Sequence, residues 1–201
     1  MSIRMFVLWV AAVFIIGLLH PATAAAQVSQ TSVIDEVREY NVKAVSVYAF
    51  SRFTVWPESS FANPNADLVI GVFGNSRIEE PLKAIAEKKK IGYRSLRIVR
   101  CVTTEDAARC HLVFVSDSIG FEEQLSMIKA IGDQSVFVVG ETRGFGAAGG
   151  VANFYISGTN VKFELNRAAA EFKGLKLNAK LLSLGTAVKP SAARASETSI
   201  R

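Results

Sequence analysis

Apolar residues recur at steps of three and four between residues 32 and 53, which predicts a long amphipathic helix. Ser32 suits the N-cap, and Asp35 and Glu36 in the first turn favour the helix dipole. The helix is expected to end before Pro57, because proline disfavours helical backbone at the residue before it. Its expected buried face comprises Val33, Val37, Tyr40, Ala44, Val47, Tyr48 and Ser51.

Short apolar segments then alternate with helix-sized segments. Strands are expected at 68–73, 96–100, 111–115 and 135–139, and helices at 77–88, after Thr103 or Thr104, and at 121–131 before Gly132. Strands rich in Val, Ile and Phe that are separated by helices are typical of βαβ units. The middle of the chain therefore predicts an α/β fold with a mainly parallel sheet flanked by helices and right-handed connections.

The pattern changes after residue 150. Two strands, 151–156 and 161–165, flank Ser157-Gly158-Thr159-Asn160 and predict a β-hairpin. Asn166 is expected to cap a short helix that ends at Gly174, and leucines in 176–184 predict a closing helix. The predicted fold class is thus α/β, with a C-terminal β-hairpin and a closing helix.

The first residues have the features of a secretory signal peptide. Arg4 precedes an apolar run, Met5–Leu19, which is shorter than the ~20 residues that a membrane span needs. Ala24-Ala25-Ala26 fits cleavage before Gln27, Ala22-Thr23-Ala24 is a second candidate site, and an uncleaved anchor is the alternative. A bacterial periplasm is the expected location. The expected organisation is a signal peptide (1–26), a flexible start (27–36), a single α/β domain (37–187) and a disordered tail (188–201).

The formal net charge of +5 changes little in this picture. The densest basic run, Lys88-Lys89-Lys90, is extended by Arg94, Arg97 and Arg100, and it is expected to be a solvated helix end and strand face. Secretion also argues against nucleic acid, so no nucleic-acid partner is expected.

The two cysteines, Cys101 and Cys110, are the clearest candidates for covalent chemistry. In an oxidising compartment an even pair predicts a disulfide, here closing a loop of about ten residues and worth roughly 2–3 kcal/mol. Two free buried thiols and a redox-sensing pair are the alternatives. A zinc site needs more ligands, and His111 is adjacent to Cys110, so no metal is expected.

No catalytic constellation stands out. Residues 144–149 match G-x-G-x-x-G, but a strand rather than a helix follows, so no nucleotide cofactor is expected. His111 opens a predicted core strand, and no G-x-S-x-G elbow is present. The sequence therefore predicts neither catalytic residues nor a cofactor.

Four features in order resemble the YfiR-like family of bacterial periplasmic proteins, over about residues 37–187. They are Val42-Lys43-Ala44 to Phe53 followed by Trp56-Pro57; Cys110-His111-Leu112-Val113-Phe114-Val115; Gly149-Gly150 before a strand; and Phe163-Glu164-Leu165-Asn166 followed by Leu181-Leu182-Ser183-Leu184. The resemblance implies an α/β fold, often dimeric, without catalysis. Cys110 matches the family cysteine before the core strand, whereas a second cysteine pair of some members is missing.

The resemblance also implies partners. The best-understood member binds the periplasmic sensor domain of an inner-membrane diguanylate cyclase and holds it inactive. An outer-membrane, peptidoglycan-associated lipoprotein can sequester that repressor, after which cyclic di-GMP rises and biofilm forms. A homodimer is a further candidate assembly.

The leading hypothesis is therefore a non-enzymatic periplasmic regulator that represses such a cyclase. Trp56, Phe61 and Phe145 are the candidate exposed contacts, since aromatic residues are enriched at interface hot spots, and a Trp56 packed on the sheet edge is the alternative. A small-molecule-binding module is the second hypothesis, and a hydrolase with an unseen site is the third. A ligand would lie beyond the carboxyl ends of the strands, at Gly74-Asn75-Ser76, Ser116-Asp117-Ser118 and Gly140-Glu141-Thr142.

Overall fold

The computed structural model describes residues 22–188, with side chains from Asp35 onward. The chain divides into two compact units, Met1–Arg38 and Glu39–Arg201, and the described strands all belong to the second. The predicted signal peptide and tail fall largely on residues 1–21 and 189–201, outside the described part. Among the helices of residues 22–188, none combines the length and hydropathy that a membrane span needs.

Helix α2 (Ala22–Phe53) begins earlier than the sequence pattern suggested. We expected a start near Ser32 and a flexible segment at 27–36, but these residues are helical. The reason lies in composition, because residues 22–26 are alanine-rich and no glycine or proline occurs between residues 22 and 56. The far end agrees with the prediction, since the helix stops at Phe53.

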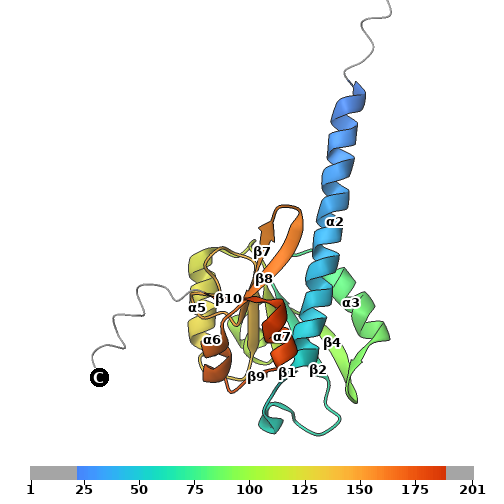
Figure 1. The fold of residues 1–201 in the computed structure, drawn as a ribbon. Coiled ribbons are helices and arrows are strands. Elements are labelled where there is room, and N and C mark those ends of the chain that lie inside the picture. Colours follow the sequence, from blue (N-terminus) through green and yellow to red (C-terminus); the bar gives the residue numbers. More distant parts are fainter. Residues whose placement is uncertain (1–21, 189–201) are drawn as a thin grey trace, which may run out of the picture. The chain divides into compact units, whose positions relative to one another are not determined.

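Eight of the described strands form one sheet, in the order β10-β8-β7-β6-β5-β2-β4-β3 (Figure 1). The five central strands, from β7 to β4, run parallel, and β7 and β8 form the predicted antiparallel hairpin. The mainly parallel α/β fold is thus confirmed. The bounds are β2 (Leu68–Phe73), β3 (Lys90–Ile91), β4 (Arg94–Cys101), β5 (Leu112–Val115), β6 (Phe137–Gly140), β7 (Ala152–Ser157), β8 (Asn160–Leu165) and β10 (Thr186–Ala187).

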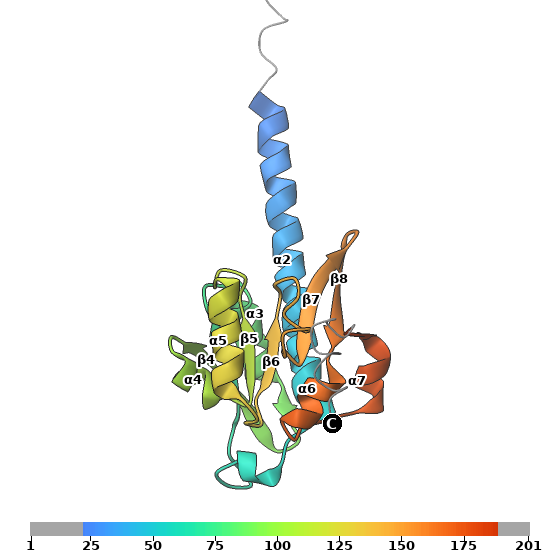
Figure 2. The same cartoon turned by 90° about the vertical axis from the view of Figure 1, so that its left-hand side faces the viewer.

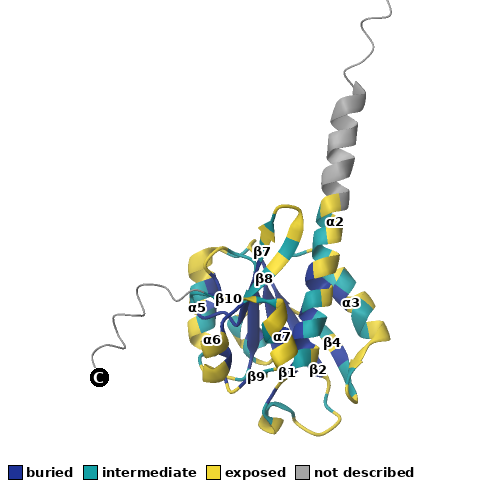
Figure 3. Ribbon diagram, in the orientation of Figure 1, coloured by how far each residue is buried: buried dark blue, intermediate teal, exposed yellow. Residues whose placement is uncertain are grey.

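Helices cover both faces of this sheet (Figure 2). Alternate residues of β2 enter different cores: Leu68, Ile70 and Val72 pack with α2, α3 and α7, whereas Val69 and Phe73 pack with α4 and α5. Figure 3 shows in dark blue the buried residues of the inner strands and of the helices. The bounds are α3 (Glu79–Lys88), α4 (Thr104–Ala108), α5 (Phe121–Ile131), α6 (Arg167–Phe172), α7 (Ala179–Leu184) and the short 3-10 turn η2 (Glu58–Ser60).

The caps explain why several predicted helix ends are right. Thr103 forms a capping box with Asp106 at the start of α4, and Asn166 accepts a hydrogen bond from the Ala169 N–H at the start of α6. Gly132 and Gly174 have positive φ angles of 58° and 66°, which suits the residue after a helix. Such helix ends can be predicted from the sequence, because each cap residue forms hydrogen bonds with backbone groups only a few residues away.

Very short strands were not predicted. Besides β3 and β10, β1 (Thr54–Val55) and β9 (Lys176–Leu177) pair antiparallel in a separate two-stranded sheet. As a result the closing helix begins at Ala179, after an Asn178 cap, and not at Lys176. A two-residue strand carries no alternating pattern, so its pairing depends on tertiary contacts.

Candidate functional site

The order of the strands creates a point where connections diverge. After β2 the chain crosses to β4 on one side, and it then returns to β5 on the other side of β2. In open α/β sheets, such a divergence leaves a crevice at the carboxyl ends of the two neighbouring strands. The loops after β2 and β5 therefore meet here, beside the loop after β6.

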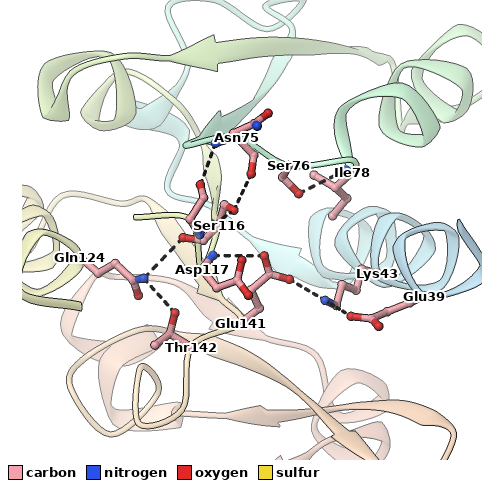
Figure 4. A network of polar contacts seen from close by, with 11 residues as sticks. Glu39, Lys43, Asn75, Ser76, Ile78, Ser116, Asp117, Gln124, Glu141 and Thr142 are labelled. Atoms are coloured by element: carbon pink, nitrogen blue, oxygen red, sulfur yellow. Dashed lines mark hydrogen bonds and ion pairs between the residues drawn. The ribbon is translucent and has the colours of Figure 1, made fainter. Parts of the chain in front are cut away.

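Hydrogen bonds tie these three predicted loops together (Figure 4). The Ser116 hydroxyl donates to the Asn75 carbonyl at 2.7 Å, and the Asn75 N–H donates to the Ser118 hydroxyl at 2.9 Å. The Asp117 N–H donates to Glu141 Oε1 at 3.2 Å. The sequence thus predicted correctly which loops share this edge of the sheet.

A lysine from α2 completes the edge. Lys43 is only 4% exposed, and its Nζ lies 2.5 Å from Glu141 Oε2, with a second ion pair to Glu39 (Figure 4). We call Lys43, Glu39 and Glu141 the edge triad. Lys43 was not predicted as a site residue, although it lies three and four residues from Tyr40 and Val47 of the apolar face. The sequence did contain a signal for this role, namely the charged Lys43 on the apolar face of the predicted helix.

Burial controls the electrostatics of the edge triad. Burial raises the pKa of Glu141 above its usual value, and the hydrogen bond from Lys43 only partly offsets this. Burial also opposes the charge on Lys43, but hydrogen bonds to Glu141 and Glu39 outweigh it and raise the Lys43 pKa. Lys43 pairs with both carboxylates, so the triad joins α2 to the loop after β6 at this edge.

Trp56 and Phe61 lie together at the opposite end of β5. The Trp56 indole donates to the His111 carbonyl at 3.1 Å, and the Phe61 ring stacks on the His111 ring at 4.4 Å. The Arg94 guanidinium covers Phe61 at 3.6 Å. Trp56 is 7% exposed, so its predicted exposure is wrong, and the alternative of a tryptophan packed on the sheet describes it.

His111 fastens the loop after η2 to the sheet. Its Nδ1 accepts a hydrogen bond from the Val69 N–H at 3.0 Å, so the neutral ring carries its proton on Nε2, which donates to the Ser60 carbonyl at 3.0 Å. Burial lowers the pKa of His111, and the nearby Arg94 and Arg97 lower it further. His111 therefore has a structural role, because both ring nitrogens bond to backbone groups.

Low pH should lower the stability of the folded protein through His111. Because the folded-state pKa of His111 is lowered, the unfolded chain binds the extra proton first, and stability falls as the pH drops below about 6.5. The uptake of one proton changes the free energy of unfolding by at most about 1.4 kcal/mol per pH unit. Urea unfolding at pH 7.5 and 5.5 should show a steeper loss for the wild type than for His111→Gln. Equal losses in the two proteins would contradict this assignment.

Phe145 is fully buried, at 0% exposure, which corrects its predicted role as an exposed contact. Its ring lies against Gly140 and Gly150, where an added Cβ would come within 2.5 Å and 2.4 Å of the ring. The glycines of this segment thus leave room for an aromatic ring. The G-x-G-x-x-G match is followed by strand β7, as predicted from the sequence.

Cys101 and Cys110 lie side by side over the middle of β2. Their Sγ atoms are 3.7 Å apart, and both residues are buried. A Cβ at Gly71 would lie 2.6 Å from one sulfur and 2.8 Å from the other, so glycine makes room for the pair. The predicted bond between them stays a prediction. Among the described residues, no group of three or more His, Cys, Asp or Glu side chains could hold a metal ion.

The chain was compared with curated proteins and with solved structures. No curated protein matches the chain. A solved structure of a conserved domain protein from Vibrio cholerae O1 biovar El Tor is 17% identical, with a TM-score of 0.46, and the match covers 61% of this chain and 55% of that one. This chain thus spans about half the length of that protein.

A family model described as YfiR/HmsC-like matches residues 40–186. The match begins within the part of α2 that contains Lys43 and ends at Thr186, the first residue of β10. It therefore includes the edge triad except for Glu39, the sulfur pair and the hairpin. Because the match covers most of its length, the chain belongs to the YfiR/HmsC-like family.

Proposed function

We propose that this protein binds the periplasmic sensor domain of an inner-membrane diguanylate cyclase and represses cyclic di-GMP synthesis. The observation that carries the proposal is family membership over residues 40–186. The family consists of periplasmic regulators of diguanylate cyclase, and it is regulatory rather than catalytic.

Repression works through a difference in affinity. The repressor binds the inactive state of the sensor more tightly than the active state, and it shifts the population by that difference. A tenfold preference corresponds to about 1.4 kcal/mol, and a shift from 1:99 to 99:1 needs about 5.5 kcal/mol. Repression of that strength requires several contacts that form with the inactive state alone.

The contact surface must use side chains that reach solvent. Trp56 and Phe145 are buried, and both faces of the Phe61 ring are occupied. Val45 on α2 (60% exposed) and Tyr93 at the β3–β4 turn (93% exposed) are better candidates. Substitution there should disturb binding without disturbing the core, because neither side chain is buried.

We expect Val45→Glu or Tyr93→Glu to weaken binding to the purified sensor domain at least tenfold, with an unchanged melting temperature. Val45→Thr and Tyr93→Phe are the matched controls and should bind like the wild type. Titration calorimetry measures the affinity and the stoichiometry of binding, and thermal unfolding measures the melting temperature. Wild-type affinity in both glutamate variants would show that Val45 and Tyr93 lie outside the interface.

The identity of the cyclase follows from a genetic test. Deleting the gene for this chain should raise cyclic di-GMP, and removing one membrane diguanylate cyclase in addition should cancel the rise. The cancelling cyclase is the direct partner candidate for the binding assay. A rise that persists in every double mutant would contradict repression of a single cyclase.

Two further partners belong to this proposal on the same family grounds. An outer-membrane, peptidoglycan-associated lipoprotein would sequester the repressor and release the cyclase. A homodimer of this chain would present two copies of the contact surface. Sedimentation of residues 27–201, alone and with the lipoprotein, tests both assemblies.

We also propose that Cys101 and Cys110 form a disulfide in the periplasm. Their sulfurs are adjacent over Gly71, and they close a loop of ten residues including both cysteines. The chain-entropy relation assigns about 2–3 kcal/mol to such a loop. Urea unfolding with and without reductant should differ by that amount, and the Cys101→Ser/Cys110→Ser variant should not respond to reductant. Two alkylatable thiols in unreduced periplasmic protein would contradict the bond.

A further inference from the structure

A second feature of the molecule lies away from the edge triad, between α5 and α6. A groove of about 470 Å³ separates these helices, and the loop before β7 contributes Ala148 and Gly149 to its lining. Sites for small ligands commonly have volumes of about 300–1,000 Å³. The groove is therefore large enough for a small organic molecule.

The walls of the groove are mostly apolar. Leu125 and Ile128 line it from α5, and Ala168, Ala169 and Phe172 line it from α6. Phe172 is 68% exposed, so its ring forms the open rim of the groove. Gly149 has a φ of +118°, and an added Cβ would lie 3.1 Å from Ile128 Cγ2, so glycine keeps the loop close to α5.

A buried ammonium group lies in the lining of this apolar groove. Lys173 is 2% exposed, and its Nζ donates to the Gly132 carbonyl at 2.5 Å. No carboxylate within residues 35–188 forms an ion pair with Lys173, and Asp133 acts on it only from a distance. Burial lowers the pKa of Lys173, and the charge of Asp133 only partly offsets this effect.

Lys43 and Lys173 differ in how their charges are balanced. Both lysines are almost fully buried, but Lys43 has two carboxylate partners and Lys173 has one neutral carbonyl. An ammonium group can donate three hydrogen bonds, so Lys173 keeps donors for another acceptor. A buried charge without a counter-charge is costly, and a bound anion would remove that cost. Lys129 adds a second positive side chain to the same lining.

We propose that the α5–α6 groove binds a small monocarboxylate with an apolar body. The carboxylate would accept hydrogen bonds from the Lys173 ammonium, and the apolar body would lie along Ile128, Leu125 and Phe172. This site is separate from the proposed contact with the sensor domain, and it does not depend on that contact. A small ligand bound there would be a second signal to which the protein responds, besides its contact with the sensor domain.

Octanoate and its neutral analogue octanamide are suitable probes. Titration calorimetry of residues 27–201 should show saturable binding of octanoate, and at least tenfold weaker binding of octanamide, because the amide has no charge for Lys173. Lys173→Met should weaken octanoate binding at least tenfold and leave octanamide binding unchanged. Phe172→Asp serves as an independent variant, since it places a negative charge on the exposed rim and should also weaken octanoate binding.

Tyr93→Phe, on a surface remote in sequence from the groove, is the control and should bind octanoate like the wild type. Equal affinity for octanoate and octanamide would overturn the role of Lys173. Absence of octanoate binding to the wild type at millimolar concentration, or wild-type affinity in both Lys173→Met and Phe172→Asp, would overturn the site. These outcomes do not depend on whether the protein represses a cyclase.

Discussion

Lys43→Met is expected to lower the free energy of unfolding by about 3–5 kcal/mol, because it leaves the buried carboxylate of Glu141 without its counter-charge. The Glu141 side chain is 4% exposed and lies 2.5 Å from Lys43 Nζ in the wild type. Water cannot replace the lost partner at such a site. Urea unfolding at pH 7 measures the difference directly.

The pH dependence of this variant separates a lost charge pair from a lost packing contact. Burial already raises the pKa of Glu141, and removing Lys43 raises it further. A carboxyl group with a raised folded-state pKa favours the folded state at low pH and disfavours it as the pH rises above the unfolded value near 4.3. The deficit of Lys43→Met should therefore be smaller at pH 5 than at pH 7.

Two control variants complete this test. Glu39→Gln should cost about 1 kcal/mol or less, because the Glu39 side chain is 32% exposed and water can replace its partner. Lys43→Met/Glu141→Gln should recover much of the loss, since no buried charge then stands alone. A deficit for Lys43→Met below 1 kcal/mol, or one that does not change with pH, would contradict the buried ion pair.

Phe50→Ala is expected to lower the free energy of unfolding by about 3–5 kcal/mol as well, for a different reason. Phe50 is fully buried, and its ring contacts the rings of Phe137, Phe154 and Phe163 at centroid distances of 5.3, 5.6 and 4.9 Å. Truncation leaves a cavity where α2 packs on the sheet. This cluster thus packs the C-terminal part of α2 against the sheet.

Phe172→Ala provides the matched control, because it makes the same chemical change at a side chain that is 68% exposed. Its cost should stay within about 0.5 kcal/mol, as for most surface substitutions. Both values come from the urea midpoint, with the slope compared between variants. Similar costs for the two substitutions would show that Phe50 does not anchor the helix.

The fold could be predicted from the sequence wherever the signal was local or periodic. The apolar strand 68–73 and the capped helix 121–131 match β2 and α5 closely, because each pattern reports burial along one element. The strand predicted after the glycine-rich segment is present as β7, because its β-branched and aromatic residues form a local signal. The three carboxyl-end loops were also grouped correctly, because a parallel sheet places them at one edge.

The errors concern contacts between distant parts of the chain. Trp56 and Phe145 were expected to be exposed as candidate interface contacts, yet one donates to His111 and the other fills space between two glycines. The partnership of Lys43 with Glu141 joins residues 98 positions apart, and no local pattern encodes it. The short strands β1 and β9 pair across a similar separation in sequence.

Cellular cyclic di-GMP is the most direct test of the central claim that this protein represses a diguanylate cyclase. The comparison needs the parent, a strain without the gene, and that strain complemented with the full chain or with residues 27–201, which lack the predicted signal peptide. We predict a rise on deletion that the full chain reverses and the leaderless form does not. Unchanged cyclic di-GMP in the deletion strain, under conditions where the parent makes the protein, would contradict the proposed function.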